Sequence, residues 1–437
     1  MSILAGREKI HAPRKRRRSA RGLVVIVHRY CGLATAVFLA IAGITGSVLA
    51  YNSELEKLLS PQLFANPQPG PPLDFATLAD RAAVLVPEGR VTAVEWTESD
   101  RMLVGFVPRI DRVTGRAFRL GFTQFFIDPW TGKETGRRIR GDLSQGIVNL
   151  MPFLYSVHWT LGAGNTGQWI MGLVAVIWTI DCFIAFYLTL PRGRGNFMLR
   201  WKYAWQVKWC ASAFRVNFDL HRASGLWTWP FLIIFAWSSV MMNIRPWYEH
   251  VMAALFDYQR PMVVYLTNAQ PNERPRLDWH AAIEVGQKLM AEQAHLHGFI
   301  AGEPLELAYS SATGAYSYEV RGSHDVFERA PKGGSTRVTF DGNTGELRVL
   351  SQPTGERIGN TIESWLYALH MARVFGRAYQ AFVCVLGLIC GLLPISGVYI
   401  WWRKRGVRER QARQMMKRRA QAVPAILGEP SEGLPLR

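Results

Sequence analysis

Four histidines stand in two repeated motifs along this chain of 437 residues. His28 and His221 each open the sequence H-R-x-x-G-L, and His158 and His370 each end the sequence L-Y-x-x-H. Two facing imidazoles can hold a haem iron through both axial positions, and helical bundles build cofactor sites in this way. The sequence contains no Cys-x-x-Cys-His, which excludes covalent c-type attachment, so such a haem would be b-type.

Residues beside these histidines fit a bound macrocycle. Gly32 and Gly225 each lie four residues after a motif histidine and therefore on the same helical face. A position without a side chain lets a flat ring lie close to the backbone. Gly162 has the same offset in the third motif, whereas Val374 takes this place in the fourth. The basic residues that could bind haem propionates through charge-assisted hydrogen bonds are Arg29, Arg222, Arg373 and Arg377.

Other interpretations of these residues remain open. A single histidine near a membrane surface is often only an amphipathic boundary residue, and two imidazoles can also begin a zinc or copper site. Arg29 and Arg222 can equally be positively charged anchors at helix ends. Asp181 lies inside an apolar stretch, where Ser396 is its counterpart in the second half. It could orient a cofactor, bind a quinol headgroup, move protons or simply bond a neighbouring helix.

Apolar residues supply the elements that must position the histidines. They concentrate in four stretches close to the ~20 residues that a helix needs to cross a bilayer. These stretches are residues 23–51, 169–190, 220–243 and 379–402. The sequence therefore predicts a membrane protein with four transmembrane helices, in which helices one and three run opposite to helices two and four. His28 and His221 then lie at one membrane face, and His158 and His370 at the other.

The net charge of +18 is a topology signal. Eight Lys and Arg residues lie in segment 1–22, six in 191–218 and nine in 403–419, against two acidic residues in all three together. Basic segments next to helix ends mark the cytoplasmic side. We therefore expect a bacterial inner-membrane protein with a cytoplasmic N-terminus (1–22), loop (191–219) and tail (403–437). Attraction to anionic lipid fits this charge better than nucleic-acid binding does.

Two long segments, 52–168 and 244–378, are expected to face the periplasm. Each contains alternating stretches typical of strands, and each has one stretch typical of a helix. The strands are expected near 101–107, 122–127, 315–321 and 336–340, and the helices near 75–86 and 279–294. The segments also share the turn sequence D-x-x-T-G, at 128–132 and 341–345. Three motifs recur in one order, which predicts an internal duplication of helix, small α+β domain and helix.

These motifs, in this order over roughly residues 20–405, resemble the PepSY-associated transmembrane family. That family comprises iron-regulated inner-membrane proteins and includes ferric-siderophore reductases of the FoxB type. The resemblance implies a four-helix transmembrane bundle, two α+β PepSY-like periplasmic domains and two b-type haems. Carried over by position, the axial ligands of the haem iron would be His28, His158, His221 and His370.

The function expected from this resemblance is electron transfer outward to a ferric-siderophore, which releases ferrous iron. The sequence has no G-x-G-x-x-G between a strand and a helix, so the donor would be a quinol or a separate reductase. A periplasmic siderophore-binding protein would be a further partner. A haem-free PepSY protein that restrains an extracytoplasmic protease is the alternative, and a siderophore or haem permease is a third hypothesis.

Overall fold

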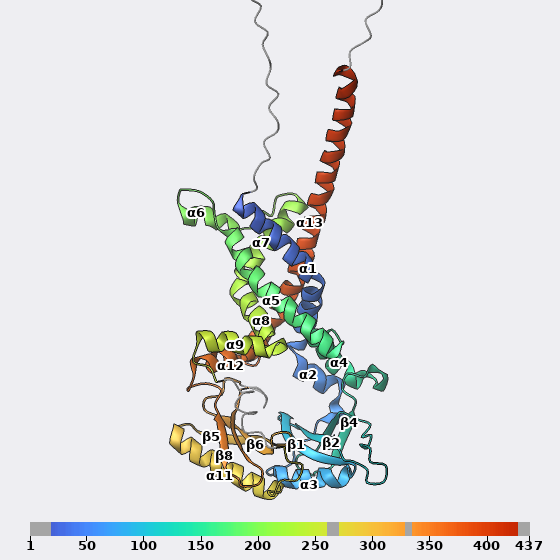
Figure 1. Cartoon of the computed structure of the whole chain (residues 1–437), viewed down its shortest axis with the longest axis vertical. Helices are drawn as coiled ribbons and strands as arrows, with labels where there is room; N and C mark the ends of the chain where they lie inside the picture. Colours follow the sequence, from blue (N-terminus) through green and yellow to red (C-terminus); the bar gives the residue numbers. More distant parts are fainter. Residues whose placement is uncertain (1–18, 260–270, 328–333, 427–437) are drawn as a thin grey trace, which may run out of the picture.

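The computed structural model describes residues 19–259, 271–327 and 334–426. Long helices form a bundle at one end of the molecule, and an antiparallel sheet with its own helices lies at the other end (Figure 1). The bundle helices are α1 (Ala20–Leu49), α4 (Leu150–Thr160), α5 (Gly164–Thr189), α7 (Ala213–Trp227), α8 (Trp229–Asn243) and α13 (Gly376–Ile426). Shorter helices are α2 (Asn52–Leu59), α6 (Phe197–Trp201), α9 (Arg245–Leu255) and α12 (Ile358–His370).

Three helices of the described residues, α1, α5 and α13, are each long and apolar enough to cross a membrane. The expected third span, 220–243, is not one continuous helix, because α7 and α8 meet at a bend of 69°. Pro230 lies in the first turn of α8, where its missing N–H is tolerated. The same missing N–H cannot bond the preceding turn, so α7 stops before it. Counted as one bent span, the pair makes a fourth crossing.

Helices α1 and α13 pack with their backbones in close approach. A Cβ atom added at Gly43 would clash with the backbone of Gly387 and Gly391 on α13. The Gly387-x-x-x-Gly391 spacing, typical of close helix packing, accordingly faces α1. Helix α13 also continues past the expected end at residue 402, as far as Ile426. The rest of the expected cytoplasmic tail, residues 427–437, lies outside the described residues.

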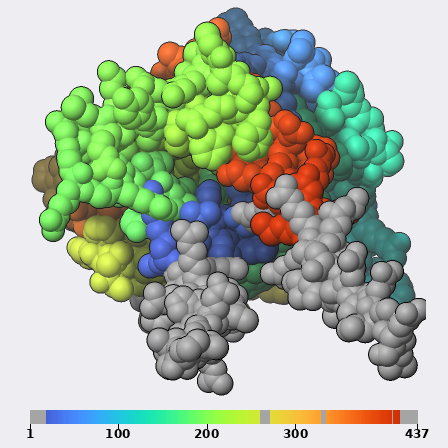
Figure 2. All heavy atoms as spheres, turned by 90° about the horizontal axis from the view of Figure 1, so that it is seen from above, coloured from blue at the N-terminus to red at the C-terminus, as the bar shows by residue number. Residues whose placement is uncertain are grey.

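The basic segments described by the structure lie at one end of the molecule. The start of α1, the linker that carries α6, and the extension of α13 all lie at the end opposite the sheet (Figure 1). Seen from that end, the green linker region lies beside the blue start of α1 and the orange-red α13 (Figure 2). This arrangement keeps the positive charge on one side of the apolar helices and the sheet on the other.

One continuous sheet of eight strands replaces the two separate domains that the sequence suggested. Its strands are β1 (Gly89–Glu98), β2 (Arg101–Pro108), β3 (Gln124–Ile127), β4 (Glu134–Arg138), β5 (Ala301–Ser310), β6 (Ala315–Gly322), β7 (Thr336–Asp341) and β8 (Leu347–Ser351). The four expected strand segments fall in β2, β3, β6 and β7. The strand order is β4-β3-β2-β1-β5-β6-β7-β8. Antiparallel pairing of β1 with β5, such as Ala93 opposite Ala308, joins the two four-stranded halves.

Two helices pack against this sheet and share one core with it. They are α3 (Phe75–Leu85) and α11 (Trp279–His297), one from each half, and they lie side by side below the strands in Figure 1. Fully buried side chains from both halves meet in this core, among them Leu78 and Phe125 from the first, and Leu307 and Phe340 from the second. Burial of a side chain of this size contributes about 1.5–3 kcal/mol. The two halves therefore form one hydrophobic unit.

The D-x-x-T-G sequences form the same turn in both halves. The carboxylate of Asp128 accepts hydrogen bonds from the backbone N–H groups of residues 130 and 131, at 2.8 and 3.0 Å. Asp341 accepts the corresponding bonds from residues 343 and 344, at 2.8 and 3.0 Å. Gly132 and Gly345 follow with φ of +64° and +76°, which a residue with a side chain adopts only under strain. The shared sequence thus has a shared local geometry.

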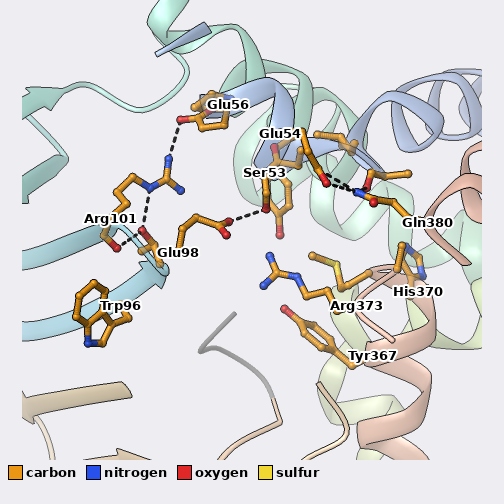
Figure 3. Close-up of a pocket in the computed structure, with 18 of the residues that line it drawn as sticks. Ser53, Glu54, Glu56, Trp96, Glu98, Arg101, Tyr367, His370, Arg373 and Gln380 are labelled. Carbon is orange, nitrogen blue, oxygen red and sulfur yellow. Dashed lines mark hydrogen bonds and ion pairs between the residues drawn. The ribbon is translucent and has the colours of Figure 1, made fainter. Parts of the chain in front are cut away.

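Helix α2 joins the bundle to the sheet through buried charges. Glu56 accepts from Arg101 of β2 at 3.2 Å and from Arg138 of β4 at 2.7 Å. Ser53 donates to Glu98 at the end of β1 at 2.6 Å, as Figure 3 shows beside the Glu56–Arg101 contact. The Glu56 side chain is only 4% exposed, so these bonds stand in a region of low dielectric.

Three 3₁₀ helices lie in the connections between β4 and α4 and before α3, and a fourth follows α6. They are η1 (Pro61–Leu63), η2 (Leu143–Gln145), η3 (Ile147–Asn149) and η4 (Lys202–Ala204).

A buried carboxyl in the sheet makes the stability of this unit depend on pH. Burial raises the pKa of Asp325, in the turn after β6, from 3.8 to about 6. The folded state then binds more protons than the unfolded state between these values, so stability falls as pH rises from about 4 to about 6. Asp325→Asn is expected to flatten this slope, measured as the melting temperature of the detergent-purified protein across that range. Equal slopes in both proteins would contradict the assignment.

Candidate haem site

The structure brings the four motif histidines together as two pairs. The rings of His28 on α1 and His221 on α7 have centroids 6.5 Å apart. The rings of His158 on α4 and His370 on α12 have centroids 6.3 Å apart. We call the first the inner pair and the second the outer pair. Residues 153 to 212 positions apart in sequence... are brought together in each pair by the packing of α1, α7, α4 and α12.

 The separations are 193 residues in the inner pair and 212 in the outer pair.

The outer histidines do not belong to the membrane-spanning helices themselves. His158 lies in the last turn of α4, and His370 is the last residue of α12. Each helix then ends in a tight turn with left-handed backbone, at Leu161 (φ 56°) and at Ala372 (φ 53°), before the apolar helix begins. Gly162 lies in the first of these turns with φ +70°, so its role is to form the turn, and the expectation that it continues the helical face of His158 is wrong.

Hydrogen bonds fix both imidazoles of the inner pair. The Nδ1 atom of His28 lies 2.9 and 3.0 Å from the two carboxylate oxygens of Asp181 on α5. The Nδ1 atom of His221 lies 2.8 Å from the hydroxyl of Ser396 and 3.1 Å from the carbonyl oxygen of Leu393, both on α13. Carboxylate and carbonyl oxygens only accept, so Nδ1 carries the proton in both rings. Their Nε2 atoms therefore keep a lone pair for a metal.

The outer pair is fixed in the same way by the other two apolar helices. The Nδ1 atom of His158 lies 3.0 Å from the hydroxyl of Thr45 and 3.0 Å from the carbonyl oxygen of Ala42, on α1. The Nδ1 atom of His370 lies 2.6 Å from the hydroxyl of Ser238 on α8. Metal-ligating histidines usually donate their second ring N–H in this manner, which sets the tautomer and the ring orientation.

The spacing of each pair suits one iron held between two imidazoles. A metal–imidazole bond is about 2 Å long and a ring centroid lies roughly 1.1 Å behind its ligating nitrogen, so two axial rings have centroids about 6 Å apart. Both observed distances, 6.5 and 6.3 Å, are close to this value. A zinc or copper site would need further ligands. No group of three or more His, Cys, Asp or Glu suited to a metal occurs in the described parts of the chain.

Glycines near the rings show where a macrocycle could lie. A Cβ atom at Gly32 would meet nothing within 4 Å, so the space beside the inner pair is open there. A Cβ atom at Gly225 would meet only Leu393, at 3.8 Å. Two further glycines touch the rings directly, because a Cβ atom would lie 2.9 Å from His158 at Gly46 and 3.2 Å from His221 at Gly397. Sequence reasoning missed these two, which follow no histidine at a fixed spacing.

The expected propionate-binding arginines differ in their surroundings. Arg222 is held by an ion pair to the buried carboxylate of Asp219 at 2.9 Å and donates to the carbonyl oxygen of Tyr203 at 2.7 Å. It therefore secures the linker before α7, which the structure supports better than a contact with a macrocycle. Arg373 points into a cavity beside His370 (Figure 3), and Arg377 lines the same cavity. Arg29 lies on α1 next to His28, with no contact that distinguishes a role.

A cavity of about 1670 Å³ extends from the outer pair toward the sheet. Its lining includes both outer histidines and the bundle residue Trp178 at one end, and Trp96 and Arg101 of the sheet at the other. Arg140 and Tyr155 also line it, with the Arg140 guanidinium 5.0 Å from the Tyr155 ring centroid. Neither was singled out from the sequence, because a lone arginine and tyrosine on a connecting segment carry no repeated motif.

The model of one family, described as the PepSY-associated TM region, matches residues 25–404 of the chain. This match takes in all four apolar stretches and the whole eight-stranded sheet between them. A search of curated proteins found no match.

Proposed function

This chain belongs to the family of PepSY-associated transmembrane regions, and on that premise we propose that it is a di-haem oxidoreductase of the bacterial inner membrane. The observation that carries the proposal is the repeated geometry of the two histidine pairs. Each pair has its rings about one iron's width apart and each ring has its Nδ1 atom bonded. His28 and His221 would hold one b-type haem, and His158 and His370 the other.

The chain's residues prepare both sites before any haem arrives. Hydrogen bonds from Nδ1 orient all four rings, so little side-chain entropy is lost when Nε2 binds iron. When bound, haem accepts and releases one electron at a time. Two such sites, one toward each end of the apolar helices, divide the ~30 Å of hydrocarbon into shorter steps for an electron. A single site would leave most of that distance uncrossed.

We further propose that the basic end of the molecule is cytoplasmic and the sheet is periplasmic. The support is the placement of the basic segments at the end opposite the sheet. The matching order of elements in the two halves, and their identical D-x-x-T-G turns, support an internal duplication that gives a four-helix transmembrane bundle. The two PepSY-like units then pair edge to edge through β1 and β5.

The proposed substrate is a ferric-siderophore in the cavity beside the outer pair. Electrons would come from a quinol or from a separate reductase. One quinol oxidised to quinone releases two electrons and two protons, which reduces two ferric ions to ferrous ions. Hard oxygen ligands hold ferric iron better than ferrous iron, so the reduced ion leaves the chelator more readily. A periplasmic siderophore-binding protein would deliver the complex, and the cavity, at about 1670 Å³, exceeds the volume of an ordinary ligand pocket.

The first test is the haem content and absorption spectrum of the detergent-purified protein. We expect two b-type haems per polypeptide, both six-coordinate and low-spin. The protein is then reduced with stoichiometric dithionite and mixed with the ferric complex of a trihydroxamate siderophore and a ferrous-specific chelator. We expect one ferrous chelate to form for each haem that returns to its oxidised spectrum.

The outcomes separate the parts of this proposal. Folded protein that contains no haem, although it was expressed with haem available, would end the electron-transfer function and favour the regulatory PepSY alternative. Two haems that stay reduced in the presence of the ferric complex would leave a haem protein with a different electron acceptor. The iron-free siderophore is the matched control, because it can bind without accepting an electron.

A further inference from the structure

The four ring N–H groups of the histidine pairs do not have equivalent acceptors. Those of His158, His221 and His370 lie against hydroxyl or carbonyl oxygens, which carry no net charge. Only His28, among these four, has a carboxylate as its acceptor, and both oxygens of Asp181 lie within 3.0 Å of the same nitrogen. The asymmetry is therefore confined to the inner pair.

Comparison of the two halves shows that this charge is a substitution at a matched place. Asp181 of α5 bonds the histidine from the first half of the inner pair, and Ser396 of α13 bonds the histidine from the second half. In the outer pair, Thr45 and Ser238 play corresponding parts, each 17 residues after the inner histidine of its own helix pair. Three hydroxyls thus hold three rings, which shows that a neutral acceptor is enough to orient an imidazole here.

A carboxylate is costly at this depth, so its retention calls for a reason beyond orientation. The Asp181 side chain is 13% exposed and lies in the middle of an apolar helix, where ionised groups are rare and usually functional. Close to an iron, a carboxylate that accepts the Nδ1 proton raises the basicity of the ligating Nε2 atom. A more basic axial ligand and a nearby negative charge both favour ferric over ferrous iron, and the low dielectric strengthens both effects.

We propose that Asp181 is a positioning and tuning residue that gives the inner site a lower reduction potential than the outer site. This inference rests on the proposed haem function. An electron that enters at the inner pair then moves to the outer pair down a potential difference, as one iron is oxidised and the other is reduced. Asp181 thus sets the direction of transfer toward the cavity, through its effect on His28.

Potentiometric titration of variants, followed by the haem absorbance, tests this proposal. Asp181→Asn keeps the shape and an acceptor oxygen but removes the charge. To observe the inner site alone, the comparison is made in a His370→Ala background. We expect the inner haem of the double variant to be at least tenfold easier to reduce, which corresponds to a potential higher by about 59 mV for one electron. Ser396→Asp, which adds a second carboxylate to the same site, is expected to shift the potential in the opposite direction.

The matched control is Asp181→Asn in a His221→Ala background, where only the outer haem is expected. Its potential should not change. An unchanged inner potential after Asp181→Asn, equal shifts of both haems, or an inner potential above the outer one in the parent protein would each overturn the proposal. Protein without any haem would instead overturn the proposed function on which it rests, so the two failures give different results.

Discussion

His370→Ala is expected to leave one haem per polypeptide where the parent protein has two. The ring is fixed by Ser238 and faces His158 across 6.3 Å, so its removal takes one axial ligand from the outer site. A ligand contributes more to metal affinity than the outer-shell groups that support it, whose loss alone costs about 10–100-fold. We therefore expect reduction of the ferric complex to fall by about 100-fold or more, measured with prereduced protein as above.

The matched control is His250→Ala. His250 is an exposed histidine of α9 whose ring contacts the carbonyl oxygen of Pro246 in its own helix. This variant should keep both haems and the parent rate. The interpretation of the outer pair fails if His370→Ala still contains two low-spin haems, or if it reduces the ferric complex at the parent rate.

Glu56→Ala is expected to destabilise the junction between the bundle and the sheet by about 3–5 kcal/mol, because it leaves buried charges without their partner. The side chains of Arg101 and Arg138 are 10% and 4% exposed, and each bonds the Glu56 carboxylate. Burial lowers the pKa of both arginines, which shows the cost of keeping their charge there. The measurement is urea unfolding of the detergent-purified protein, followed by tryptophan fluorescence.

Glu134→Ala is the comparison for that experiment. Glu134 pairs with Arg137 in the same strand, but both side chains are partly exposed, at 27% and 42%. Pairs of this kind contribute about 0–1 kcal/mol. Similar losses of stability in the two variants would show that the Glu56 cluster is not the link between the two parts of the molecule.

Repeated motifs made the histidine pairs predictable from the sequence. One histidine near a helix end has many explanations, but four in matching motifs on antiparallel segments must meet in twos if the halves pack alike. The same comparison matched Asp181 with Ser396, and both contact an inner histidine. Thr45 and Ser238 escaped notice, because hydroxyl residues inside helices usually bond the preceding turn and carry no motif.

Nonlocal pairing explains what the sequence did not predict about the fold. The strands β2, β3, β6 and β7 show local alternation, but the β1–β5 contact depends on residues from different halves, and no local pattern specifies it. The bend between α7 and α8 had a visible signal in Pro230. The hydrophobicity of the segment concealed that signal, since an apolar stretch long enough to span a membrane suggests one straight helix.

The seam between the two halves also sets a timetable for synthesis of the protein. Ala93 and Ala308, which are paired across β1 and β5, are 215 residues apart. A ribosome adds about 5–20 residues per second, so the first four strands wait roughly 10–40 seconds for their partner. During that interval the edge of β1 presents unpaired backbone groups to any other extended chain. The newborn chain thus passes through a vulnerable stage, during which a chaperone that covers strand edges would have the most effect on yield.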